Sequence, residues 1–180
     1  SGSLNLCMAG GVALNGVANM RVLQETQCEQ LYIQPAAGDS GGALGAALYA
    51  YHILLGHPRN YVMDHVYYGK EYNQQDVNAA LVKSGLQFEE IDNEDKLIDV
   101  TVDHLTNGDA LGWFQGRFEW GPRALGNRSI LADPRSSSMK DRINIKVKFR
   151  EPFRPFAPAI IDEYIHNYFQ IPGGESNYPA

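Results

Sequence analysis

The chain has 180 residues, of which 44% are hydrophobic and 20% are charged, and its formal net charge is -6. This composition is typical of a soluble globular protein with one full domain or two small ones. Proteins that bind nucleic acid are normally basic as a whole, so the negative charge argues against a nucleic-acid partner. The longest apolar stretch, residues 41–55, is too short to cross roughly 30 Å of hydrocarbon, so we expect no membrane span.

Two strand–turn–helix units are predicted at the start of the chain. In each, a short apolar run is followed by small residues and then by apolar residues at helical spacing. The predicted segments are a strand at 4–8, a glycine turn at 9–11, a helix through Val22, a strand at 30–34, a loop at 35–42 and a helix from Ala43 to about Leu55. This order predicts α/β packing. Two strands and two helices cannot bury a parallel sheet on both faces, so we expect this part to be the end of a larger domain.

A linker at Gly56–Asn60 separates these units from a region of different composition, and we expect domains at 1–60 and 61–180. Asparagine N-caps and glycine stops mark two helices in the second domain. The predicted segments are a helix from Asn73 to Gly85, a strand at 88–91, a helix from Asn93 to Gly108, a strand at 110–115, a strand at 159–161 and a frayed tail at 172–180.

Cysteine and histidine usage points to neither disulfides nor a complete metal site. Cys7 and Cys28 lie in apolar sequence, and free thiols there fit the reducing cytoplasm, which is the location we expect. The five histidines are scattered, and no two have the helical spacing of a metal-binding motif.

Positive charge is concentrated in one part of the chain. Ten of the fifteen Lys and Arg residues lie between Trp113 and Arg154, most of them in the blocks 116–129 and 146–154. A single arginine in a loop is by default a solvated surface charge. Glycines, prolines and aromatic residues shape both blocks, however, so for the group we expect a pocket that binds a small, densely charged anion.

The glycine turn and the acidic loop each have two interpretations. Gly10 and Gly11 either let the backbone approach a nucleotide or only relieve strain in a tight turn. Asn15, one turn into the expected helix, binds a ribose or an adenine edge or faces solvent. Asp39 either caps the second helix or acts as a metal ligand that faces the nucleotide.

Four segments carry a family resemblance: Ala9–Asn15, Gln34–Ala47, Trp113–Arg135 and Arg150–Pro158. In this order they resemble the O-carbamoyltransferases of the nodulation-protein NodU and tobramycin TobZ type. The resemblance implies the end of an actin-like ATPase lobe, which is related to the ATPases of tRNA threonylcarbamoyl transfer. It also implies a YrdC-like α/β domain that follows this lobe and is truncated at its end.

The resemblance further implies that carbamoyl phosphate and ATP form a carbamoyl-adenylate, from which the carbamoyl group passes to a hydroxyl group of a small-molecule acceptor. The implied cofactors are ATP and a divalent metal, either iron or magnesium. Catalytic roles fall to Arg123, Lys148 and Arg154, and substrate-binding roles fall to Arg117, Asn127, Arg128 and Arg150. Nucleotide contacts fall to Gly10, Gly11, Val12 and Asn15, and the metal ligand is Asp39. Glu119 either orients a neighbouring arginine or acts as a general base.

One departure from the family limits what this chain is expected to do. The metal-binding histidines of the family come from an earlier part of the lobe, which is also the partner that this piece lacks. We therefore expect weak metal and nucleotide binding and no full transfer activity. The alternatives are a non-catalytic module that binds a nucleotide or a phosphate metabolite and, third, an RNA-binding protein.

Overall fold

A computed structural model describes residues 2–170 of the chain. These residues form two compact units, which are described separately below. The first unit comprises residues 2–69, 119–123 and 163–170, and the second comprises 70–118 and 124–162. The domain boundary expected at residue 60 stays a prediction, and so does the kinship of the two parts with an actin-like ATPase and a YrdC-like domain.

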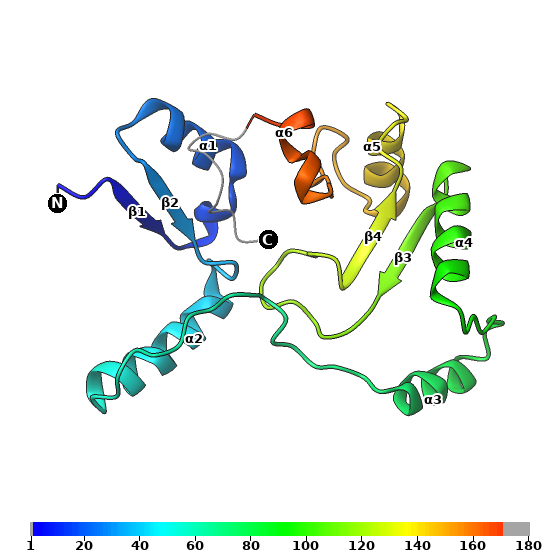
Figure 1. Cartoon of the computed structure of the whole chain (residues 1–180), viewed down its shortest axis with the longest axis horizontal. Helices are drawn as coiled ribbons and strands as arrows, with labels where there is room; N and C mark the ends of the chain where they lie inside the picture. The colour runs from blue at the N-terminus through cyan, green and yellow to red at the C-terminus, as the bar shows by residue number, and fades with distance from the viewer. Residues whose placement is uncertain (1, 171–180) are drawn as a thin grey trace. The chain divides into compact units, whose positions relative to one another are not determined.

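The first unit contains the expected strand–turn–helix units. Strands β1 (Asn5–Met8) and β2 (Gln30–Ile33) pair in parallel, with Asn5 opposite Gln30 and Met8 opposite Ile33. Helix α1 (Gly16–Glu25) connects them and packs against β2 (Figure 1). A short 3₁₀ helix, η1 (Gly11–Leu14), fills the turn between β1 and α1. The predicted α/β order is therefore confirmed for this part of the chain.

Helix α2 (Asp39–Tyr49) begins four residues before the predicted start at Ala43, and it continues as a π-helical turn, η2 (Ala50–Leu54). Glycine and serine are poor helix formers, so the sequence favoured a loop at 35–42. Tertiary packing overrides this preference, because Ala36 and Ala37 are buried where the loop meets the start of the helix. Ala13 and Val66 complete the small buried core of this unit.

The second unit is built on the antiparallel strands β3 (Ala110–Phe114) and β4 (Arg128–Ala132), paired from Ala110 opposite Ala132 to Phe114 opposite Arg128. Helix α4 (Glu94–Thr106) lies along β3 (Figure 1). Strand β3 was predicted, whereas β4 was missed because it starts within an arginine block. The remaining elements of this unit are α3 (Gln74–Ser84), α5 (Met139–Arg142) and the π-helical turn η3 (Ile143–Val147). The 3₁₀ helix η4 (Asp162–Tyr164) spans the boundary after residue 162, and α6 (Ile165–Tyr168) belongs to the first unit.

Both predicted helix starts of the second unit are confirmed. Asn73 and Asp76 form a reciprocal capping box at the start of α3, and Gly85 ends this helix in the left-handed conformation. The strands predicted at 88–91 and 159–161 are wrong, because both segments are irregular. A short apolar run becomes a strand only where another strand pairs with its backbone, and neither segment has such a partner in the structure. The predicted frayed tail at 172–180 lies outside the described residues.

Between residues 2 and 170, every helix is too short or too polar to cross a lipid bilayer. Cys7 and Cys28 are both free thiols. At this level the structure confirms a mixed α/β protein.

Candidate functional site

The loops that follow β1 and β2 meet at one edge of the parallel sheet. Gly10 has a φ angle of 98°, a left-handed value that favours glycine, and its N–H donates to the carbonyl of Ala37 at 2.6 Å. The turn after β1 is thereby joined to the loop after β2. In parallel α/β sheets, ligands bind at the carboxyl ends of the strands, and these two loops occupy that position.

Asn15 is the N-cap residue of α1, so the expectation that it lies one turn inside the helix is wrong. Its side-chain oxygen accepts a hydrogen bond from the N–H of Ala18 at 3.2 Å, which satisfies one free donor of the first turn. Gly11 begins η1, and the side chain of Val12 is 78% exposed beside it. These roles account for the turn structurally, and nucleotide contact by Gly10, Gly11, Val12 and Asn15 stays a prediction.

Asp39 is the first residue of α2, and Gly38 is the N-cap. The interpretation of Asp39 as the helix cap is therefore wrong. Its carboxylate lies in the first turn, where the positive end of the helix dipole stabilises a negative charge. Across residues 2–170, no three His, Cys, Asp or Glu side chains gather as a metal site would require. The donors of the described chain do not fit a metal centre, so metal ligation by Asp39 stays a prediction.

The structure divides the first arginine block between the two units, and residues 119–123 belong to the first. One guanidinium nitrogen of Arg123, Nη2, donates to the carbonyl of Leu14 at 3.1 Å. Gly121 packs so tightly that a Cβ there would lie 2.8 Å from the carbonyl oxygen of Pro35. The backbone N–H of Trp120 donates to the carbonyl of Val66 at 2.6 Å. Arg123 therefore lies beside the turn that carries Gly10 and Asn15.

Lys148 and Arg154, which the sequence grouped with Arg123, belong to the second unit. A shared role of these three cations stays a prediction. The four substrate-binding candidates, Arg117, Asn127, Arg128 and Arg150, also lie in the second unit.

Arg128 is half-buried at the start of β4 and makes extensive contacts with its own block. Its guanidinium nitrogens donate to the carbonyl oxygens of Gln115 at 2.5 Å and Gly116 at 3.1 Å. Its guanidinium carbon lies 3.5 Å from the ring centroid of Phe114 and 4.1 Å from that of Phe118. These contacts favour a bracing role for Arg128, because they hold the strand-connecting loop against an aromatic surface.

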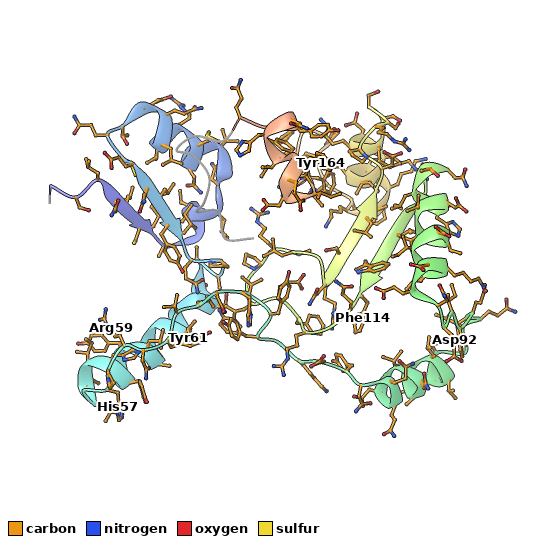
Figure 2. All side chains as sticks on the ribbon, viewed as in Figure 1. His57, Arg59, Tyr61, Asp92, Phe114 and Tyr164 are labelled. Atoms are coloured by element: carbon orange, nitrogen blue, oxygen red, sulfur yellow. The ribbon has the colours of Figure 1, made fainter. Side chains whose placement is uncertain are left out.

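The aromatic residues in and next to this block are divided between the two units. Trp120 belongs to the first unit, and the rings of Phe114 and Phe118 contact Tyr72 at centroid distances of 6.1 and 6.3 Å. Figure 2 shows Phe114 at the end of β3, where the arginine block begins. The rings therefore support the base of the loop.

Asn127 and Arg117 stabilise the same loop from its two ends. The side-chain nitrogen of Asn127 donates to the carbonyl of Arg117 at 2.8 Å, and its oxygen accepts from Gln115 at 3.3 Å. Arg117 forms an exposed ion pair with Glu71 at 3.3 Å. An exposed pair of this kind contributes little to stability, so a bound anion could replace Glu71 at small cost.

The second block begins at the end of η3 and contains Lys148, Arg150 and Arg154. Lys148 is exposed and ends η3. Arg150 lies 4.9 Å from the ring centroid of Phe156, and its Nε donates to the side-chain oxygen of Asn144 at 2.7 Å. Sequence reasoning missed Asn144, because an isolated asparagine between two isoleucines carries no motif.

Arg154 forms an exposed ion pair with Glu151 at 2.8 Å. The pKa of the Glu151 carboxyl is lowered, first by a hydrogen bond from its own backbone N–H and then by the positive charge of Arg154. Glu151 is therefore a carboxylate at neutral pH and occupies one edge of the Arg154 guanidinium.

The fold and the two arginine-rich loops define a mixed α/β protein with concentrated cationic loops. Comparison with known proteins identifies the family. Residues 1–48 match the family model described as carbamoyltransferase N-terminus, and residues 102–179 match the one described as carbamoyltransferase C-terminus.

The relatives align over nearly the whole chain. Nodulation protein NolO of Bradyrhizobium diazoefficiens is 42% identical and aligns with 99% of this chain and 33% of its own length. The 3'-hydroxymethylcephem-O-carbamoyltransferase of Streptomyces clavuligerus is 35% identical and aligns with 93% of this chain and 31% of its own length. Nodulation protein U of Rhizobium fredii is 34% identical and aligns with 98% of this chain and 28% of its own length.

The chain therefore belongs to the carbamoyltransferase family, as its sequence motifs indicated. It spans only between 28% and 33% of the length of these three relatives.

Proposed function

We propose that this chain binds carbamoyl phosphate and takes part in the transfer of its carbamoyl group to a hydroxyl group. The family membership supports the reaction class, and the single observation that carries the proposal for this chain is the concentration of arginines in two structured loops. The hydroxyl class of acceptor follows from the name of the Streptomyces clavuligerus relative, 3'-hydroxymethylcephem-O-carbamoyltransferase.

The proposed first reaction joins the carbamoyl group to AMP. Mass balance requires one water, which cleaves carbamoyl phosphate into carbamate and phosphate. A carbamate oxygen then bonds to the α-phosphorus of ATP, and the bond to the departing pyrophosphate breaks. In the second reaction the acceptor oxygen bonds to the carbamoyl carbon, AMP leaves, and the acceptor proton is released. Negative charge accumulates on the phosphate groups in the first reaction, which is where guanidinium groups assist most.

Lys148 and Arg154 are the proposed anion ligands of the second unit. Both are exposed, and the Arg154 side chain is 50% exposed within its ion pair with Glu151. Because exposed ion pairs contribute at most about 1 kcal/mol, a phosphate can replace the Glu151 carboxylate at small cost and gain a stronger charge-assisted hydrogen bond. Arg150 assists from the same loop.

The proposed role of the first unit is to bind the nucleotide. Arg123, next to the Gly10–Asn15 turn, would place a positive charge where the phosphates of ATP approach the backbone N–H groups. A divalent metal is implied by the family alone.

The test is the exchange of labelled pyrophosphate into ATP, measured on this chain with and without carbamoyl phosphate. The expected result is exchange that depends on carbamoyl phosphate and is lost in Arg154→Ala, with Arg59→Ala as the matched control. Thermal stabilisation by both ligands without exchange would overturn the catalytic proposal and favour a binding module. Salt-sensitive retention of tRNA instead would favour the RNA-binding alternative.

A further inference from the structure

We propose that Asn144 is a positioning residue that sets the geometry of the loop carrying Arg150 and Arg154. Its exposed fraction is 0%, and it lies in η3 between α5 and the second arginine block. This inference rests on the proposed function, because it concerns the anion that these arginines bind.

The side-chain amide of Asn144 is hydrogen-bonded at both ends to this loop. Its nitrogen donates to the carbonyl oxygens of Pro152 at 3.1 Å and Arg154 at 2.9 Å. Its oxygen accepts from Nε of Arg150 at 2.7 Å, and its backbone carbonyl accepts from the N–H of Arg150 at 2.9 Å. One buried side chain thus contacts the beginning, the middle and the end of residues 150–154.

Only an amide of this length supplies two donors and an acceptor at these positions. A carboxylate of the same shape would keep the contact with Arg150 but would face two carbonyl oxygens without a proton to donate. An apolar side chain would leave buried carbonyl groups unpaired, which is costly. The arrangement therefore depends on asparagine specifically.

The backbone just before Arg150, which is hydrogen-bonded to Asn144, has an unusual conformation. Phe149 has a φ angle of 49°, and it is the one non-glycine residue with a positive φ in the part of the chain that the structure describes. Its side chain is 85% exposed, so its own burial does not stabilise this conformation. The hydrogen bonds of Asn144 to Arg150 hold the following residue in place. Strained backbone of this kind clusters at functional sites.

The consequence is a pre-ordered guanidinium. Arg150 is held at one edge by Asn144 and on one face by Phe156, so little side-chain entropy is lost when an oxyanion binds. The carbonyl of Arg154 is held by the same amide, so both arginines are positioned by one residue.

The experiment measures the affinity of the chain for pyrophosphate and for carbamoyl phosphate by titration calorimetry. Asn144→Asp should weaken both by about tenfold, the effect of losing one to two hydrogen bonds. The matched control is Asn78→Asp, an exposed position on α3, which should change affinity by less than about twofold.

A second variant covers the case in which Asn144→Asp does not fold. Arg150→Lys keeps the positive charge but lacks the Nε donor to Asn144, so its affinity for both anions should also fall by about tenfold. Asn144→Ala also breaks the hydrogen bond with Nε of Arg150, so combining it with Arg150→Lys should reduce the affinity by no more than about twofold beyond Asn144→Ala alone. A purely structural role would lower the melting temperature without this coupling.

The proposal is overturned if folded Asn144→Asp binds both anions within about twofold of wild type. It is also overturned if the losses of affinity in Asn144→Ala and Arg150→Lys add fully in the double variant. If wild type binds pyrophosphate but not carbamoyl phosphate, the proposed function fails and the role of Asn144 is decided on pyrophosphate. If wild type binds neither anion, both proposals fail.

Discussion

Gly41 and Gly42 are adjacent in α2, yet the structure predicts opposite effects of alanine at the two positions. A Cβ at Gly41 would lie 1.9 Å from the carbonyl oxygen of Ala36 and 3.0 Å from its carbonyl carbon. A Cβ at Gly42 would have no neighbour within 4 Å. Each residue is therefore the natural control for the other.

The expected magnitudes follow from two opposing effects. Alanine in place of glycine within a helix stabilises by about 0.5–1 kcal/mol. At Gly41 the added methyl group meets backbone, which cannot rotate away, and such overpacking costs about 1–3 kcal/mol. Gly41→Ala should therefore lower the free energy of unfolding by about 1–2 kcal/mol net, and Gly42→Ala should raise it by about 0.5–1 kcal/mol.

Thermal unfolding is the first assay. For a chain of this size, the melting temperature should fall by about 2–8 °C in Gly41→Ala and rise by about 1–4 °C in Gly42→Ala. Amide exchange gives a local second measurement. The clash displaces Ala36, whose neighbour Ala37 accepts the hydrogen bond of Gly10, so exchange at the Gly10 N–H should quicken in Gly41→Ala alone. Two variants that shift the melting temperature in the same direction would refute the reasoning.

Three further changes have defined outcomes. Arg128→Lys removes the planar guanidinium that donates to two carbonyl groups and lies over Phe114. Chemical denaturation should therefore show that the free energy of unfolding falls by about 1–3 kcal/mol, and a fall below about 0.5 kcal/mol would contradict the bracing role. A hydrogen bond with Tyr61 raises the pKa of Tyr68 to about 12. This hydrogen bond stabilises the fold fully below about pH 10, and the stabilisation is lost as the pH rises through about 12. In Tyr61→Phe, ultraviolet titration should show Tyr68 ionising closer to about 10, and an unchanged value would count against this contact. The lowered pKa of Glu151 stabilises the fold above about pH 4.3, and this contribution is lost as the pH falls through the lowered value. Acid unfolding of Glu151→Gln should therefore depend less on pH than that of wild type, and an equal dependence would contradict this contribution.

Local sequence signals predicted the elements whose structure depends on neighbouring residues. The capping box of Asn73 and Asp76 is complete within four residues, and the glycine stop at Gly85 needs only a left-handed φ angle. The parallel strands also follow from local pattern, because their apolar runs and the helix between them leave few alternatives.

Signals that depend on distant residues were missed. Arg123 and Leu14, which share a hydrogen bond, are 109 residues apart, so the sequence placed Arg123 with the neighbouring arginines of its block. The role of Asn144 depends on a loop that folds back over it, and no residue type near it signals this contact. The start of α2 was missed for the same reason, because distant residues hold the loop before it: Ala37 accepts a hydrogen bond from Gly10, and Gly121 packs against Pro35.

The proposed function requires that arginines of the second block bind carbamoyl phosphate. The direct measurement is a titration of the chain with carbamoyl phosphate, followed through the side-chain Nε–H signals of its arginines by nuclear magnetic resonance. We expect the signals of Arg150 and Arg154 to shift together with one dissociation constant, while the signal of Arg21, which is paired with Glu25 on α1, stays in place. Unchanged Arg150 and Arg154 signals at saturating ligand, or an equal shift of Arg21, would contradict it.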